Sequence, residues 1–236
     1  MEHIEAAHHR LMLGLAELTD TQVRQPSLLP GWTIGHTLSH IALNAEAFVR
    51  VAKGLTAGEV GSMYPTSESR DAAIEAGAHR SAQEIVAHCQ AANAELLAIW
   101  STLTAEQILI GQANRTPGTP TFPATNIPLA RLREVEVHGS DTGLPALEIA
   151  HWSSAYVDVD LPIQLPTVAR RLGHSFSAVD ETGAIHTSGD IAGHPTGSDP
   201  IPCTRRDLLA WTLNRAQPKG FPSIGSWQAP PPPPPP

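Results

Sequence analysis

The stretch Arg131-Leu-Arg-Glu-Val-Glu-Val-His-Gly-Ser-Asp141 predicts a helix that carries chemistry. It follows Asn126-Ile-Pro128, and a proline suits the first helical turn, where its missing N–H has no partner within the helix. Glu134 and His138 are four residues apart, so their side chains point the same way along this helix. A carboxylate and an imidazole held in this way are half of a metal site. For an isolated pair of this kind, an ordinary ion pair on a solvated face is the more frequent outcome.

A pair of histidines stands on another predicted helix earlier in the chain. Thr33 is a natural N-cap, and the apolar spacing that follows predicts a helix to about Lys53, ending at Gly54. His36 and His40 lie on this helix four residues apart, and His40 falls beside the apolar stripe, so we expect it to face inward. Taken alone, His40 reads as a core histidine bonded to the backbone and His36 as a surface residue.

Together the two helices predict a metal site. Metal sites in helical bundles draw side chains from facing helices. A catalytic zinc typically takes three nitrogen or oxygen ligands from the protein and keeps one position open for water or substrate. Two histidines and one glutamate form such a set, and two helices that each carry a pair at this spacing are more specific than either helix alone.

Composition narrows the class of protein. The chain has 236 residues, 41% hydrophobic and 16% charged, with a formal net charge of −8. This balance, without a cluster of basic residues, argues against nucleic acid and anionic lipid as partners. The two cysteines, Cys89 and Cys203, do not indicate a disulfide framework, which fits a reducing cytosol. No signal peptide or transmembrane run is recognisable, so we expect a soluble, cytoplasmic protein.

The remaining helix signals predict a bundle in the first part of the chain. Further helices are expected over residues 2–20, 67–78 and 81–100. The segment Gly111–Pro123 reads as a loop or a β-excursion. Four long helices joined by loops favour an up-down bundle, so we expect a mainly α fold with a metal-binding four-helix bundle over residues 1–147.

The pattern changes after Pro145, where we expect a small α+β domain over residues 150–228. Recurring prolines at Pro162 and Pro166 confine its first helical piece to residues 167–172. The other predicted elements are strands at 175–179 and 184–188 around the turn Asp180-Glu-Thr-Gly183, and a last helix at Leu208–Arg215. Residues 229–236 read as a disordered polyproline tail.

Two motifs resemble the mycothiol-dependent maleylpyruvate isomerase family of the DinB/YfiT-like superfamily. They are Leu29-Pro-Gly-Trp-Thr-Ile-Gly-His-Thr-Leu-Ser-His-Ile-Ala42 and Arg133-Glu-Val-Glu-Val-His-Gly-Ser-Asp141. The resemblance implies a DinB-like four-helix bundle that holds a divalent metal, usually zinc, followed by a smaller α+β C-terminal domain. It covers nearly the whole chain.

The resemblance also implies roles for individual residues. The metal ligands would be His40, Glu134 and His138, with His36 left as a neighbour or a structural residue. Arg70 and Arg215 match arginines around the active site of the family, and ordinary surface salt bridges are the alternative for both. Asp141 either orients His138 or is merely a residue at the C-terminal end of the helix, and we favour the second reading.

The implied activity is the isomerisation of maleylpyruvate to fumarylpyruvate in gentisate degradation, with mycothiol as cofactor. A thiolate that adds to the alkene leaves a single bond, which rotates before the thiolate is eliminated. The open metal position would lower the pKa of the thiol, and the arginines would bind the substrate carboxylates. Two alternatives stay open: a metal-dependent S-transferase that joins mycothiol or a similar thiol to an electrophile, and a non-catalytic metal-binding module that makes contacts through its proline tail.

Overall fold

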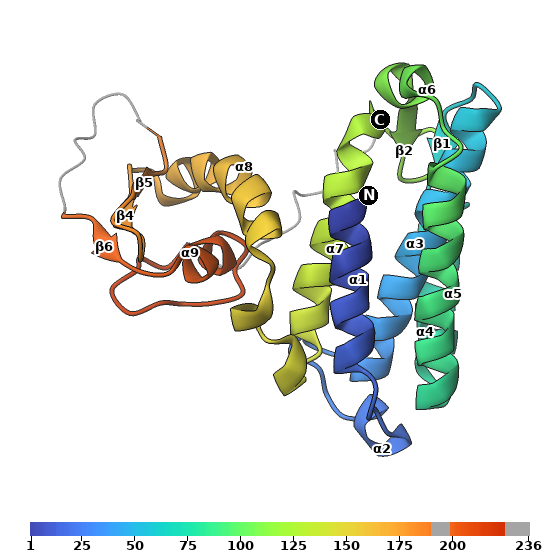
Figure 1. The fold of residues 1–236 in the computed structure, drawn as a ribbon, viewed down its shortest axis with the longest axis horizontal. Helices are drawn as coiled ribbons and strands as arrows, with labels where there is room; N and C mark the ends of the chain where they lie inside the picture. Colours follow the sequence, from blue (N-terminus) through green and yellow to red (C-terminus); the bar gives the residue numbers. More distant parts are fainter. Residues whose placement is uncertain (190–198, 225–236) are drawn as a thin grey trace. The chain divides into compact units, whose positions relative to one another are not determined.

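The chain separates into two units, Met1–Ser153 and Ser154–Pro236, in a computed structural model that describes residues 1–189 and 199–224 (Figure 1). The first unit is a four-helix bundle, and the second combines helices with a small sheet. The expected fold, a mainly α protein with a bundle and a small α+β C-terminal domain, is confirmed. The predicted polyproline tail, residues 229–236, lies outside the described residues.

Four long helices frame the first unit. They are α1 (Glu2–Gly14), α3 (Ile34–Thr56), α5 (Ala82–Trp100) and α7 (Ile127–Asp141). Helix α3 packs on α5 and α7, and α1 packs on the same two helices, which closes the bundle. The predicted N-caps are confirmed: the Thr33 side chain accepts a hydrogen bond from the backbone N–H of His36, and Ser81 does so from Glu84.

Apolar side chains from all four helices fill the bundle and stabilise it by leaving water. Several are almost completely buried: Leu11, Leu38, Ile41, Phe48, Ile85 and Leu96. Among them lies a charged residue, Arg131, which is only 1% exposed. Its guanidinium donates to Ile41 O at 2.8 Å, to Asn44 Oδ1 at 3.0 Å and to Asn93 Oδ1 at 3.5 Å. Since these acceptors belong to α3 and α5, Arg131 on α7 ties three helices together.

The first predicted helix and the predicted end of the second are wrong. Helix α1 stops at Gly14, and a separate short helix, α2 (Asp20–Val23), begins at a capping box on Thr19. Helix α3 passes through Gly54 instead of ending there. A side chain at position 54 would lie 2.8 Å from Gly61 Cα, so this glycine lets the returning chain cross the helix closely.

The returning chain begins a small sheet at one end of the bundle. Strand β2 (Gln112–Asn114) pairs in parallel with β1 (Gly61–Ser62) and antiparallel with β3 (Thr121–Pro123). This confirms the predicted β-excursion. Helix α4 (Ser67–Ala78) follows as predicted and packs on α3. Shorter elements complete this unit: α6 (Ala105–Ile110), which the sequence did not predict, and 3-10 turns η1 (Ala124–Asn126), η2 (Pro145–Leu147) and η3 (Ile149–His151).

The second unit contains two helices and a three-stranded sheet. Helix α8 (Ser154–Leu172) packs on α9 (Arg205–Thr212). Strand β4 (Ser177–Val179) lies in the middle of the sheet, antiparallel to β5 (Ile185–Thr187) and parallel to β6 (Ile201–Pro202). The predicted hairpin is therefore confirmed.

The predicted helical piece at residues 167–172 is much too short, because α8 continues through Pro162 and Pro166. Each proline removes one intrahelical hydrogen bond and crowds a carbonyl of the preceding turn. Both prolines lie on the exposed face of α8, where water can bond the freed carbonyls. The opposite face buries Tyr156, Leu161 and Val168 among others, and this burial maintains the helix. Among the described residues, no helix is long and apolar enough to cross a membrane.

His8 gives the bundle a pH-dependent stability. It is 7% exposed and donates from Nε2 to Cys89 O at 3.1 Å. Burial, together with the charge of Arg131, lowers the pKa of His8 from 6.5 to about 4. As the pH falls below 6.5, His8 becomes protonated in the unfolded chain but stays neutral in the folded chain. The contribution of His8 to the free energy of unfolding is therefore complete above pH 6.5 and is lost as the pH falls to 4. The full loss is on the order of 3 kcal/mol.

We expect His8→Gln to flatten the pH dependence of the free energy of unfolding between pH 7 and pH 4, measured by urea denaturation. Glutamine keeps an N–H donor and does not titrate in this range. His9→Gln is the matched control, because His9 is the exposed neighbour on the same helix. Equal slopes for His8→Gln and the wild type would contradict this assignment.

Candidate metal centre

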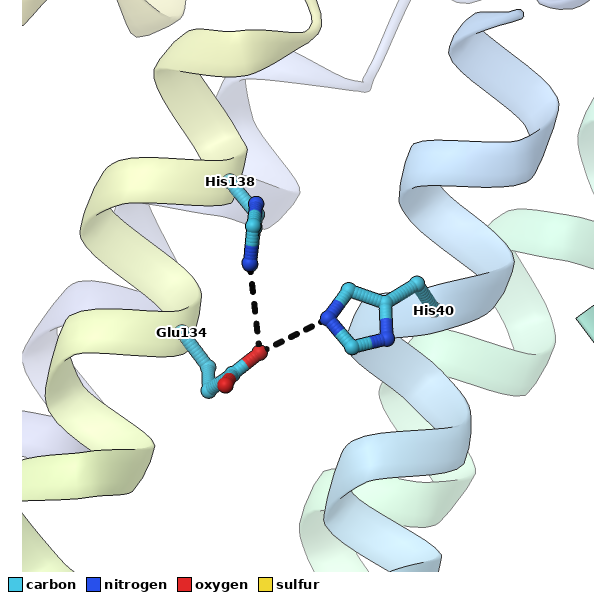
Figure 2. A group of neighbouring side chains, drawn as sticks. All are labelled: His40, Glu134 and His138. Atoms are coloured by element: carbon cyan, nitrogen blue, oxygen red, sulfur yellow. Dashed lines mark ion pairs between the residues drawn. The ribbon is translucent and has the colours of Figure 1, made fainter. Parts of the chain in front are cut away.

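Three predicted ligands come together where α3 faces α7 (Figure 2). Glu134 Oε2 lies 2.9 Å from His40 Nε2 and 3.5 Å from His138 Nε2. One ligand atom from each residue lies within 4.8 Å of the other two. The two residues on α7 share one face because of their spacing, and α3 supplies the third from across the helix–helix contact.

The cluster is sheltered but open to small molecules. The His40 side chain is 7% exposed, whereas those of Glu134 and His138 are 27% and 20% exposed. His40 therefore faces inward, as predicted, and the α7 residues line the accessible side. This combination suits a site that holds an ion and still admits a ligand.

Asp141 fixes the orientation of His138. Its carboxylate Oδ2 lies 2.8 Å from His138 Nδ1, and its side chain is 2% exposed. A carboxylate accepts a hydrogen bond, so Nδ1 carries the hydrogen and the lone pair is left on Nε2, which faces Glu134. The expectation that Asp141 is merely a residue at the helix end is wrong.

The electrostatics of the cluster favour an anionic glutamate and neutral His40. Burial alone would raise the pKa of Glu134, but the hydrogen-bonding contact with His40, the neighbouring imidazoles and the charge of Arg131 outweigh it and lower the pKa to about 2. Burial lowers the pKa of His40, although Glu134 acts in the opposite direction. A carboxylate and a neutral imidazole are the forms that bind a metal.

The arrangement fits a divalent metal ion. Glu134 Oε2 is buried and lacks a hydrogen bond of good geometry within the described residues, although His40 Nε2 is close by. With its hydrogen on Nδ1, a neutral His138 turns the lone pair of Nε2 toward this oxygen, 3.5 Å away. A cation between them would relieve their repulsion. The donor set of two nitrogens and a carboxylate accommodates zinc and several other divalent ions.

Arg70, on α4, lies beside the cluster. Its side chain is 17% exposed, and Nη2 is 3.4 Å from His40 Nδ1, a contact at the long limit of a hydrogen bond. Its Nη1 donates to Asp71 Oδ1 at 2.6 Å. The guanidinium therefore lies next to a candidate metal ligand, and this long contact leaves it able to bond to another group.

Arg215 belongs to the second unit, and its functional role stays a prediction. The last helix was expected to reach Arg215, but α9 ends at Thr212. Asn214 then takes a left-handed conformation with φ of 59°, which turns the chain out of the helix. The backbone N–H of Arg215 donates to Ala210 O at 2.7 Å, so the residue caps the helix instead of lying within it.

His36 has a structural role. Its Nδ1 accepts a hydrogen bond from the backbone N–H of Thr33 at 3.2 Å, completing the capping box of α3. Its Nε2 lies 3.1 Å from Glu75 Oε2, and its ring stacks on Trp32. The four-residue spacing between His36 and His40 thus arises from a helix cap and is not a signal of metal binding.

Two residues near the cluster had no signal in the sequence. Arg131 lies one turn before Glu134 and helps to keep it anionic, but a single arginine in a helix looks like a surface residue. Tyr64 is 4% exposed, and its pKa is raised by burial and by nearby Glu134. Its place was not predictable because it follows a strand of only two residues.

Comparisons with known proteins concern the family and the fold. The family described as mycothiol maleylpyruvate isomerase N-terminal domain matches residues 4–143. A crystal structure of the mycothiol-dependent maleylpyruvate isomerase is similar, with a TM-score of 0.74 and 19% identity over 91% of this chain and 88% of that chain. A histidine-to-alanine variant of that isomerase gives the same values. No curated protein matches in sequence. At this identity, the solved structures support the fold.

We expect the purified protein to bind one divalent ion per chain, measured by elemental analysis after dialysis against zinc. His138→Ala should lower the metal content most, because one of the three protein ligands is lost. Asp141→Asn should weaken binding by about 10- to 100-fold, because loss of an outer partner disorients the histidine. The control is His79→Ala, which changes an exposed histidine paired with Glu75. Equal metal content in all four proteins would contradict the assignment.

Proposed function

We propose that this chain, which belongs to the mycothiol maleylpyruvate isomerase N-terminal domain family, is a metal- and thiol-dependent isomerase that converts maleylpyruvate to fumarylpyruvate. The observation that carries the proposal is the convergence of His40, Glu134 and His138 inside the bundle that the family defines. The cytoplasm and the degradation of gentisate are the setting that we propose for this reaction.

The reaction needs a nucleophile, and neither cysteine of the chain suits this role. Rotation about a double bond requires the bond to become single for a time, which addition of a thiolate achieves. Burial raises the pKa of Cys89 to about 12 and that of Cys203 to about 11, so both are protonated thiols at neutral pH. An external thiol, which we propose to be mycothiol, fits this requirement.

The residues of the cluster have separate tasks. His40, Glu134 and His138 would hold a divalent ion, most simply zinc, which when bound supplies a Lewis acid that lowers the pKa of a thiol. Asp141 retains the hydrogen on His138 Nδ1 and so keeps Nε2 aimed at the site. The buried anion of Glu134 offsets part of the charge of the ion.

Arginines suit the substrate, which carries two carboxylates and two keto groups, one of them conjugated with the double bond. The guanidinium group is planar, always charged and able to bind a carboxylate through two hydrogen bonds. Arg70, beside His40, would bind the substrate and stabilise the negative charge that develops on the keto oxygen during addition. We assign a similar task to Arg215 from the second unit.

We expect metal-loaded wild-type protein with mycothiol to convert maleylpyruvate to fumarylpyruvate. Chromatography that separates the two isomers measures this conversion. Arg70→Met should lower kcat/KM by about 10²- to 10³-fold, the usual cost of losing one group that stabilises a developing anion. The control is Arg170→Met, because Arg170 is an exposed residue of α8.

The thiol must be regenerated in each turnover. Recovery of the thiol in a stable thioether with the substrate would contradict the isomerase and indicate an S-transferase. Unchanged turnover in Arg70→Met would remove this residue from the reaction while leaving the metal cluster in place.

A further inference from the structure

Three arginines gather around the buried ring of Tyr64, next to the candidate metal centre. The guanidinium carbons of Arg50, Arg70 and Arg115 lie 5.7, 5.8 and 5.8 Å from the centre of this ring. These distances fall within the range of cation–π attraction, and such a contact does not use the N–H groups of a guanidinium, which remain able to donate to another group.

Contacts of the backbone position each arginine near the ring of Tyr64. The N–H of Tyr64 donates to Arg115 O at 3.0 Å, which extends the pairing of β1 with β2. Arg50, on α3, donates from Nε to Met63 O at 2.7 Å. Arg70 stands in the first turns of α4, which begins soon after Tyr64. Three separate elements therefore hold the arginine cluster, Arg50, Arg70 and Arg115, in position.

The carboxylates nearby do not neutralise the arginine cluster. Arg50 lies 3.9 Å from Glu46, whose closer partner is His88 at 2.7 Å. Arg70 pairs with Asp71, which is 69% exposed. Arg115 has no ion pair in the part of the chain that the structure describes. Glu134, near Tyr64, is in contact with His40 and His138, so each carboxylate near the arginine cluster has another partner or faces solvent, and the guanidinium groups can bind a further anion.

A small cleft adjoins the arginine cluster. It has a volume of about 210 Å³, and Arg50, Tyr64 and Arg70 form part of its wall together with Glu46, Leu43 and Ala73. Arg115 is not part of this wall and lies beside the ring of Tyr64. Arg70 Nε is buried and has no hydrogen-bond partner within the described residues. Apolar walls with guanidinium groups on one side suit a small organic acid, whose carboxylate would meet the arginines.

We propose that Arg50, Arg70 and Arg115 form a carboxylate-binding subsite around Tyr64. In taking the carboxylate to be that of the isomerase substrate, this inference rests on the proposed function. Arg70 serves both the subsite and the metal centre through its contact with His40. Arg50 and Arg115 determine specificity, because they select a substrate with a second carboxylate and do not touch the metal ligands.

The test is calorimetric titration of metal-loaded protein, without added thiol, with maleate, a cis dicarboxylate that is not isomerised when the nucleophile is absent. Arg115→Gln and Arg50→Gln should each weaken maleate binding by about tenfold or more, the usual effect of losing a charged hydrogen bond. The control is Lys53→Gln, an exposed cation of α3 that pairs with Glu95. Arg50→Lys is included because it keeps a positive charge and an N–H donor near Met63 O.

Thermal unfolding checks that the variants fold. If Arg50→Gln does not fold, the test uses Arg115→Gln alone, because Arg115 is exposed and its replacement should not disturb the fold. Absence of maleate binding to the wild type, or equal binding to wild type and variants, as expected for binding at the metal alone, would overturn the subsite. Arginine-dependent maleate binding without isomerase activity would support the subsite and remove the proposed function. Isomerase activity with a KM that is unchanged in Arg50→Gln and Arg115→Gln would support the proposed function and overturn the subsite.

Discussion

The structure depends on charged side chains, one fully and one largely removed from water, where α3 meets α7. Arg131 is held by neutral oxygens of two other helices, and Glu134 one turn later is held by His40 and His138. Buried charges are costly unless they are bonded, so this part of the bundle forms only when the partners meet in register. The same constraint that aligns the helices also brings three ligand atoms to one point.

The sequence predicted the parts of this arrangement that follow from helical periodicity. The spacing of Glu134 and His138 and the inward place of His40 required only a helix and an apolar stripe. The cap at Thr33 was predictable from its residue type before an apolar helix. His36 belongs to the same capping box, so its spacing from His40 only resembles a metal motif. Local rules thus identified which residues share a face, but they could not distinguish a ligand from a capping residue.

What the sequence did not predict arises from tertiary contacts. Arg131 has no local signature, because its acceptors are supplied by α3 and α5. The arginines around Tyr64 come from three elements far apart in the chain, joined by a strand pairing too short to recognise. The prolines of α8 misled the prediction because burial of the opposite face of this helix, a tertiary contact, outweighs their cost.

The central claim is that His40, Glu134 and His138 hold a divalent metal at which an external thiol reacts. X-ray absorption at the zinc edge of the metal-loaded protein tests it most directly. The account predicts the scattering pattern of two imidazoles, reduced to one in His138→Ala, and the appearance of sulfur beside the metal when mycothiol is added. A spectrum that is the same in both proteins, or that gains no sulfur, would contradict the account.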